Sequence, residues 1–163
     1  MKFKKFLLFL FFYCLIFTNS YAIEPDVFVQ STVNRASQIL SKNITKEEKI
    51  NELKNIAKET VDIKGVGFYS LGSARKSLNK SQLQQYLNLF ENYFLKSFSS
   101  RLAEYTNPEI DVKNKKKINE NYTMVNSVLI ATSSRPEIKI DWRVYTKNKD
   151  NPLIRDLIIE GLS

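Results

Sequence analysis

The hydrophobic pattern of this sequence changes its period once, near residue 108, and this change limits the fold more than any other feature. Before it, apolar residues between positions 83 and 105 recur every three or four residues, the spacing of one helix face. After it, apolar and polar residues alternate through 138–145, which is typical of a strand with one buried face. Helices followed by consecutive strands predict an α+β fold.

The region before residue 83 contains two further helical patterns. Residues 26–40 carry an apolar stripe at spacings of four, three and four. Thr45 and Glu48 form a T-x-x-E capping box, in which the threonine oxygen accepts from the Glu48 N–H and the glutamate reaches back to residue 45. We therefore expect a second helix from this box to Val61.

A third helix begins at another capping signal. Asn79 and Gln82 resemble a second capping box, and residues 62–71 before it predict a short helix or turn, with Gly72 where a C-cap would lie. The pattern after Asn79 predicts a helix of about 25 residues, ending near Asn107. Its wide apolar face consists of Leu83, Tyr86, Leu87, Phe90, Tyr93, Phe94, Phe98 and Leu102.

Short strand patterns fill the rest of the chain. They cover residues 110–113, 122–132, 138–145 and 153–160, and the polar segments 114–121, 133–136 and 147–152 separate them. Strands joined by such short turns pair in sequence order. The sequence therefore predicts an antiparallel four-stranded meander with the helices on one face.

The first 22 residues have the pattern of a secretory signal peptide. Three lysines within residues 2–5 precede an apolar run over residues 6–17, and Ser20 and Ala22 suit cleavage after Ala22. An uncleaved membrane anchor is the alternative. However, twelve helical residues extend only about 18 Å, whereas the hydrocarbon core of a bilayer is about 30 Å thick.

Cleavage would leave residues 23–163 as a single domain. The only cysteine, Cys14, lies in the signal segment, so the mature chain has no disulfide and its stability depends on its core. The formal charge of +8 falls to +5 when the three signal lysines are removed.

Composition disfavours most catalytic chemistry. The chain has no histidine, and the predicted mature part has no cysteine, so the commonest general base, the usual transition-metal ligands and the thiol nucleophile are missing. No nucleophile-elbow, P-loop or dinucleotide-binding motif occurs. The carboxylates of Asp62, Asp141, Asp156 and Glu160 remain candidates, but we interpret them as solvated or salt-bridged groups. We expect no enzyme, no cofactor and no metal site.

A basic cluster is formed by Lys113, Lys115, Lys116 and Lys117, in a predicted hairpin turn. Such clusters contact nucleic acids or anionic lipids, or are simply solvated. Export and the lack of interleaved aromatic residues argue against nucleic acid. Transient contact with an anionic membrane surface remains open.

The aromatic helix face has two interpretations. Its side chains either fill a solid core or border an apolar cavity of roughly 300–1,000 Å³, the usual size of a ligand site. Periodicity alone does not distinguish a filled interior from a hollow one.

Three segments carry motifs in a characteristic order. Residues 61–105 read VDIKGVGFYSLGSARKSLNKSQLQQYLNLFENYFLKSFSSRLAEY, with a Leu-Gly pair before a helix of the form L-x-x-x-Q-x-x-x-Y/F-x-x-x-F that ends in R-L-x-E-Y. Residues 138–143 read IKIDWR, and residues 155–163 read RDLIIEGLS, which is similar to D-V-x-x-E-G-x-S. Over essentially the whole mature chain, these motifs resemble the MlaC family, also called the toluene-tolerance family.

The resemblance implies a periplasmic phospholipid-binding protein. Members of the family carry phospholipid between an outer-membrane lipoprotein complex and an inner-membrane ABC transporter complex. The implied fold is a curved antiparallel four-stranded sheet packed with N-terminal helices, and an apolar cavity between the two layers holds the acyl chains.

Matching positions imply a set of lipid-binding residues, to which we add Tyr86 from the aromatic helix face. The candidates are Phe68, Leu71, Tyr86, Phe90, Phe94, Leu129 and Trp142.

The sequence also departs from the family pattern. The chain stops at Ser163, where family members continue with a helical segment. Residues 151–153 read NPL, at the place where the family usually has a tight turn and an aromatic residue. We expect a less completely walled pocket and reduced or altered lipid binding. The alternatives are an exported interaction protein or decayed family member without lipid binding, and a small enzyme that uses Asp62 or Asp141.

Overall fold

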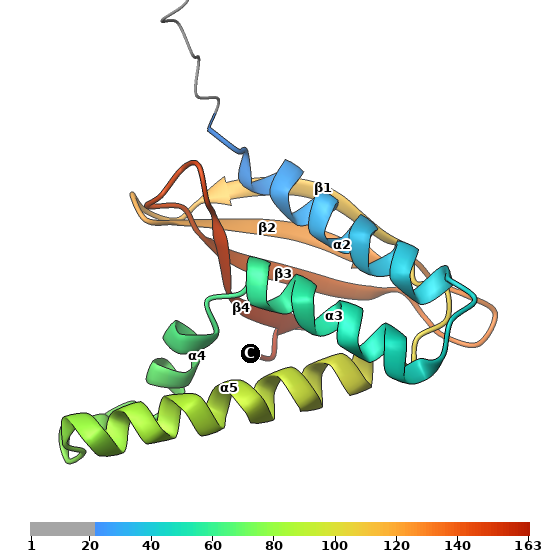
Figure 1. Cartoon of the computed structure of the whole chain (residues 1–163). Helices are drawn as coiled ribbons and strands as arrows, with labels where there is room; N and C mark the ends of the chain where they lie inside the picture. Colours follow the sequence, from blue (N-terminus) through green and yellow to red (C-terminus); the bar gives the residue numbers. More distant parts are fainter. Residues whose placement is uncertain (1–21) are drawn as a thin grey trace, which may run out of the picture.

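The computed structural model describes residues 22–163 (Figure 1). Within them the helices come first: α2 (Pro25–Ser41), α3 (Lys46–Thr60), α4 (Ile63–Ser70), the 3-10 helix η1 (Gly72–Lys76) and α5 (Lys80–Leu102). The strands follow: β1 (Ile110–Lys117), β2 (Tyr122–Leu129), β3 (Ile138–Tyr145) and β4 (Leu153–Ile159). The predicted α+β fold class is confirmed.

Two sequence-based expectations concern membranes and export. The predicted signal segment, apart from Ala22, lies outside the described residues. In the described part of the chain, no helix is both long enough and apolar enough to cross a bilayer.

The sheet is an antiparallel meander in the order β1-β2-β3-β4. Val125 lies opposite Trp142, and Ser127 lies opposite Ile140, and all four side chains are buried on one face. Strand alternation places their polar neighbours on the other face. The helices lie on the buried face, and Figure 1 shows α2 running along it.

Local capping signals set the beginnings of the helices. Thr45 and Glu48 make both hydrogen bonds of a capping box before α3, and Asn79 and Gln82 do the same before α5, as predicted. Hydrogen bonds from the side chain and backbone of Thr45 lower the pKa of the Glu48 carboxyl. Such caps satisfy N–H groups that have no partner inside the helix.

Removing the α5 cap gives a direct test of its contribution. We expect Asn79→Ala to lower the free energy of unfolding by about 1 kcal/mol, because the Gln82 N–H loses its acceptor. Urea unfolding followed by circular dichroism measures this change. Gln84→Ala is the control, since within residues 22–163 that exposed side chain bonds only to Asn88. Equal losses in the two variants would argue against the cap.

Two boundaries near α4 and α5 refine the predictions. The segment 62–71 forms a true helix, α4, and Gly72 after it adopts a φ of 53°, which suits glycine at a helix end. Helix α5 stops at Leu102, earlier than the predicted end near Asn107. Asn107 itself has a φ of 47°, which is incompatible with a continuing right-handed helix.

The lysine cluster corrects the prediction of a hairpin turn over residues 114–121. Lys115, Lys116 and Lys117 belong to β1 and pair with β2, so the turn is confined to residues 118–121. β1 is an edge strand whose alternation is hidden because its second half is exposed on both faces. Lysine is typical of such edges because its charge opposes pairing with another chain.

The core consists of three separate clusters rather than one. Val29 and Val33 of α2 pack on the sheet around Val125 and Trp142. The end of α2 packs on α3 through residues such as Leu40 and Leu53. A third cluster joins α3 and α4 to α5 through Ala57, Ile63 and Leu95.

Candidate functional site

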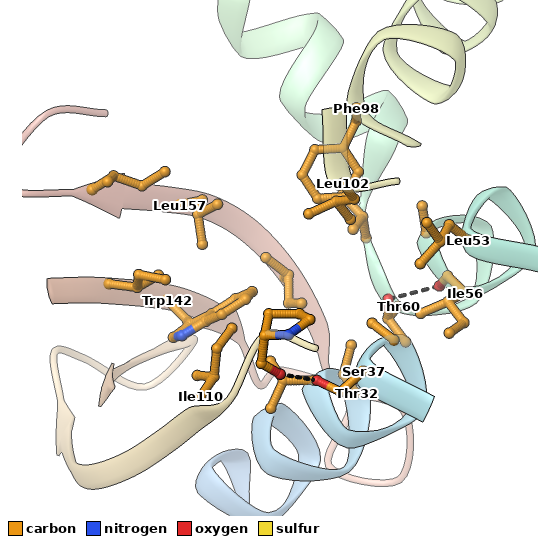
Figure 2. Close-up of a pocket in the computed structure, with 18 of the residues that line it drawn as sticks. Thr32, Ser37, Leu53, Ile56, Thr60, Phe98, Leu102, Ile110, Trp142 and Leu157 are labelled. Atoms are coloured by element: carbon orange, nitrogen blue, oxygen red, sulfur yellow. Dashed lines mark hydrogen bonds between the residues drawn. The ribbon is translucent and has the colours of Figure 1, made fainter. Parts of the chain in front are cut away.

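The three core clusters surround a cavity of about 380 Å³ (Figure 2). In Figure 2, Trp142 and Leu157 of the sheet lie on one side of it, and Leu53 and Ile56 of α3 lie on the other. The wall also includes side chains from every layer of the fold: Val33, Ala36 and Leu40 of α2, Ala57 of α3, Val66 of α4, Phe94, Phe98 and Leu102 of α5, and Leu129, Ile140 and Ile154 of the sheet.

The serine and threonine hydroxyl groups in the wall have partners within the protein. Thr32 donates to the Phe28 carbonyl at 2.8 Å, which lies one helical turn earlier. Ser37 donates to the Pro108 carbonyl at 2.7 Å, and Thr60 donates to the Ile56 carbonyl at 2.7 Å, as the dashed lines in Figure 2 show. These groups are already satisfied, so a molecule in the cavity meets essentially hydrocarbon.

The indole N–H of Trp142 also has a hydrogen-bond partner within the protein. Its Nε1–H donates to the Ser127 hydroxyl at 2.8 Å, and that hydroxyl donates to the Ile140 carbonyl at 3.0 Å. This short chain of hydrogen bonds fixes the ring with its polar edge engaged by the sheet. Trp142 therefore adds an apolar surface to the cavity wall.

Helix α5 contributes a ladder of aromatic rings. Ring centroids are 5.9 Å apart from Tyr86 to Phe90, 6.1 Å from Phe90 to Phe94 and 5.3 Å from Phe94 to Phe98. The one-turn spacing aligns the rings, and offset stacking is favourable at these distances. The end of the ladder at Phe94 and Phe98 reaches the cavity.

Exposed residues in the wall mark where the cavity opens. Ile159 at the end of β4 is 44% exposed, and Tyr105 after α5 is 40% exposed. The guanidinium of Arg135 lies 5.7 Å from the centre of the Tyr105 ring. We define Tyr105 and Ile159 as the mouth of the cavity.

An ion pair closes the opposite end, where α3 meets α4. Arg155 lines the cavity, and its guanidinium contacts the carboxylate of Asp62 and donates to the Tyr122 hydroxyl at 2.8 Å. It also lies 4.4 Å from the centre of the Tyr145 ring. Burial alone would lower the pKa of Arg155, but the hydrogen bond and charge of Asp62 outweigh it and the pKa is raised.

The structure separates the seven predicted lipid-binding residues into three groups. Phe94, Leu129 and Trp142 line the cavity. Phe90 packs beside the third core cluster, and Gly67 of α4 approaches its ring so closely that an added Cβ would lie 2.7 Å from it. The remaining three lie outside the cavity wall, near the α4–α5 junction: Phe68, Leu71 and Tyr86.

Sequence reasoning missed most of the wall from α2 and α3. Ala36, Leu53 and Ile56 lie on apolar stripes that are indistinguishable in sequence from ordinary core positions. They line the cavity because no other side chain packs against them on that side. A local sequence pattern does not show this.

The four candidate carboxylates each bond to a neighbour. Asp62 pairs with Arg155, and Asp156 pairs with Arg143 at 3.3 Å. The other two accept hydrogen bonds: Asp141 from Asn126 at 2.7 Å, and Glu160 from the Lys139 N–H at 2.5 Å. Within residues 22–163, no three acidic, histidine or cysteine side chains gather as metal ligands.

These features define the class as an α+β protein built around an apolar, ligand-sized cavity between helices and a curved sheet. Pockets of this size and lining are characteristic of sites for apolar ligands. The chain belongs to the MlaC family, because the family model described as MlaC protein matches residues 30–163. The resemblance seen in its motifs is thereby confirmed.

Comparison with solved structures supports the same fold. The chain is similar to a phospholipid-binding protein from Ralstonia solanacearum, whose structure was determined in complex with a phospholipid. The TM-score is 0.70 at 15% identity, and the match covers 86% of this chain and 80% of the other. No curated protein matches the sequence significantly.

Proposed function

We propose that this protein is a periplasmic phospholipid-binding carrier whose cavity holds acyl chains. The observation that carries the proposal is the cavity of about 380 Å³, whose wall is almost entirely hydrocarbon and whose serine and threonine hydroxyls are already hydrogen-bonded. Membership of the MlaC family and the likeness to a protein solved with phospholipid support it.

Acyl chains suit this wall. They carry no polar group along their length, so they make no demand for hydrogen bonds that the wall lacks. We propose that Phe94, Leu129 and Trp142 contact the chains directly, while the head group lies at the mouth beside Tyr105 and Ile159. Phe90 would act by supporting Phe94 in the ladder.

The energetics agree with a carrier that needs no catalysis. Burial of acyl chains stabilises by about 0.8 kcal/mol per CH₂ relative to water. A bilayer offers nearly the same stabilisation, so the net free energy of moving a lipid from bilayer to cavity lies near zero. Direction must then come from partner proteins.

The family suggests what those partners are. We propose that the protein moves lipid between the outer and inner membranes for an Mla-type system, with an outer-membrane lipoprotein complex at one end and an inner-membrane ABC transporter complex at the other. We also propose export with cleavage after Ala22, so that residues 23–163 form the working domain. Helix α2 begins just beyond this site, at Pro25.

Lipid extraction tests the proposal most directly. We expect protein purified from the exported fraction of expressing cells to release phospholipid, identified by mass spectrometry of the organic extract. Delipidated protein should take up lipid again from phosphatidylglycerol vesicles. If neither the purified nor the re-exposed protein contains phospholipid, the alternative of an interaction protein without lipid binding is correct.

A further inference from the structure

The corner where α4, η1 and the start of α5 meet has an unusual charge distribution. Four basic residues occur between positions 63 and 90, and no acidic residue does: Lys64, Arg75, Lys76 and Lys80. We call these four residues the basic corner. Asp62 precedes this segment, but its charge is paired with Arg155.

The corner cations have no salt-bridge partner among the described residues. Arg75 instead lies over the ring of Phe68, 5.2 Å from its centre. The lysine-rich strand β1 differs, because Lys115 bonds to Asp26 and Glu24 and Lys113 pairs with Asp111. The hydrogen bonds of Asp26 and Glu24 raise the pKa of Lys115. Two of the four lysines of β1 are therefore paired with carboxylates, whereas no cation of the basic corner is.

Exposed aromatic residues lie in the same segment of the chain as these cations. Tyr69 is 74% exposed and Phe68 is 43% exposed, although both belong to a helix with one buried face. The corner is held firmly, since Ser70 and Tyr86 share a hydrogen bond of 3.0 Å and Gly67 packs against Phe90. Figure 1 shows α4 lying beside the beginning of α5.

We propose that the basic corner, with Phe68 and Tyr69, is a docking surface for an anionic lipid bilayer. Unpaired cations attract the head groups of anionic lipids, and aromatic side chains are favoured at the interface between head groups and acyl chains. An acidic protein partner would match the cations but gives no reason for rings presented between them. The mouth of the cavity lies beyond the other end of α5, so docking leaves it uncovered.

Vesicle flotation tests this surface, with exported, purified protein and vesicles of phosphatidylcholine alone or mixed with phosphatidylglycerol. We expect binding only to the mixed vesicles, and weaker binding as salt screens the charges. A cation near such a surface contributes about fivefold in affinity, so R75Q/K76Q/K80Q should lose on the order of a hundredfold.

The matched control removes three cations from the sheet instead. K116Q/K117Q/K139Q has the same net charge as the corner variant, and these three lysines also lack salt bridges within residues 22–163. We expect it to lose far less affinity. Equal losses of affinity in both variants would mean that only net charge matters, which would overturn the proposal.

A second measurement locates the contact. Tyr69→Trp adds an indole at the most exposed aromatic position of the corner, and its emission should shift to shorter wavelengths when anionic vesicles are added. An unshifted emission would overturn the proposal. Failure of wild-type protein to bind mixed vesicles would also do so and would favour an acidic protein partner. Bound phospholipid is measured separately, so this result does not depend on what fills the cavity.

Discussion

Phe98→Asp is expected to remove the phospholipid that the exported protein carries. Phe98 is half-buried in the cavity wall and stacks on Phe94. A carboxylate at this position is hydrated while the cavity is empty, but acyl chains would strip its water and leave it without a partner. Burying an unpaired charge costs several kcal/mol, so we expect at least about a hundredfold less bound lipid. Mass spectrometry of extracted lipid, normalised to protein, measures the loss.

A matched variant on the same helix controls for the added charge. Leu89 is 62% exposed and lies outside the cavity wall, so Leu89→Asp should retain its lipid. Circular dichroism confirms that both variants are folded. Equal retention of lipid by both variants would show that the cavity around Phe98 is not where lipid binds.

An uncharged substitution can block the same cavity without lowering the stability of the protein. Ala36 lies half-buried in the wall, and Ala36→Phe would fill part of the hollow. Cavity filling commonly stabilises a protein, so we expect less bound lipid together with an unchanged or higher Tm. This combination separates blocked binding from unfolding.

Asp62→Ala is expected to cause a large loss of stability. One carboxylate oxygen accepts from the Gly65 N–H at 2.9 Å and caps α4, and the other pairs with Arg155. The side chains are only 19% and 30% exposed, so alanine leaves a poorly hydrated guanidinium unpaired. We expect a loss of about 3 kcal/mol, or a fall in Tm of roughly 10 °C.

Two further variants divide this loss between its causes. Asp62→Asn keeps an oxygen to cap α4 but loses the charge, so it should fall between wild type and alanine. Asp111→Asn breaks a solvent-exposed pair with Lys113 and should leave Tm unchanged. If Asp62→Ala is as stable as wild type by thermal melting, Arg155 does not depend on this partner.

Much of the fold was predictable because its signals are local. The capping boxes at Thr45 and Asn79 involve residues three apart, and the structure forms both of them. The alternation in β3 identified its buried face, since Ile140, Trp142 and Val144 are all buried. Signals of this kind depend on the chain within one turn or one strand, so neighbours far away do not alter them.

The candidate site was predictable only in part. Periodicity placed Tyr86, Phe90, Phe94 and Phe98 on one face, and the structure keeps their rings in one ladder. It did not show how α5 is rotated and placed. The buried residues of α5, Leu95 and Ser99, lie on the neighbouring face. Of the ladder, only Phe94 and Phe98 reach the cavity.

The sequence by itself determined the element types, the caps, the α+β order and, through its motifs, the family. The tertiary structure decided that β1 extends to Lys117, that Phe68 faces outward and that a hollow lies between three core clusters. The physical reason is that a helix or strand reports its own apolar face through the spacing of its residues. Whether two such faces meet or leave a cavity between them depends on how all the helices and strands are placed relative to one another in the folded protein.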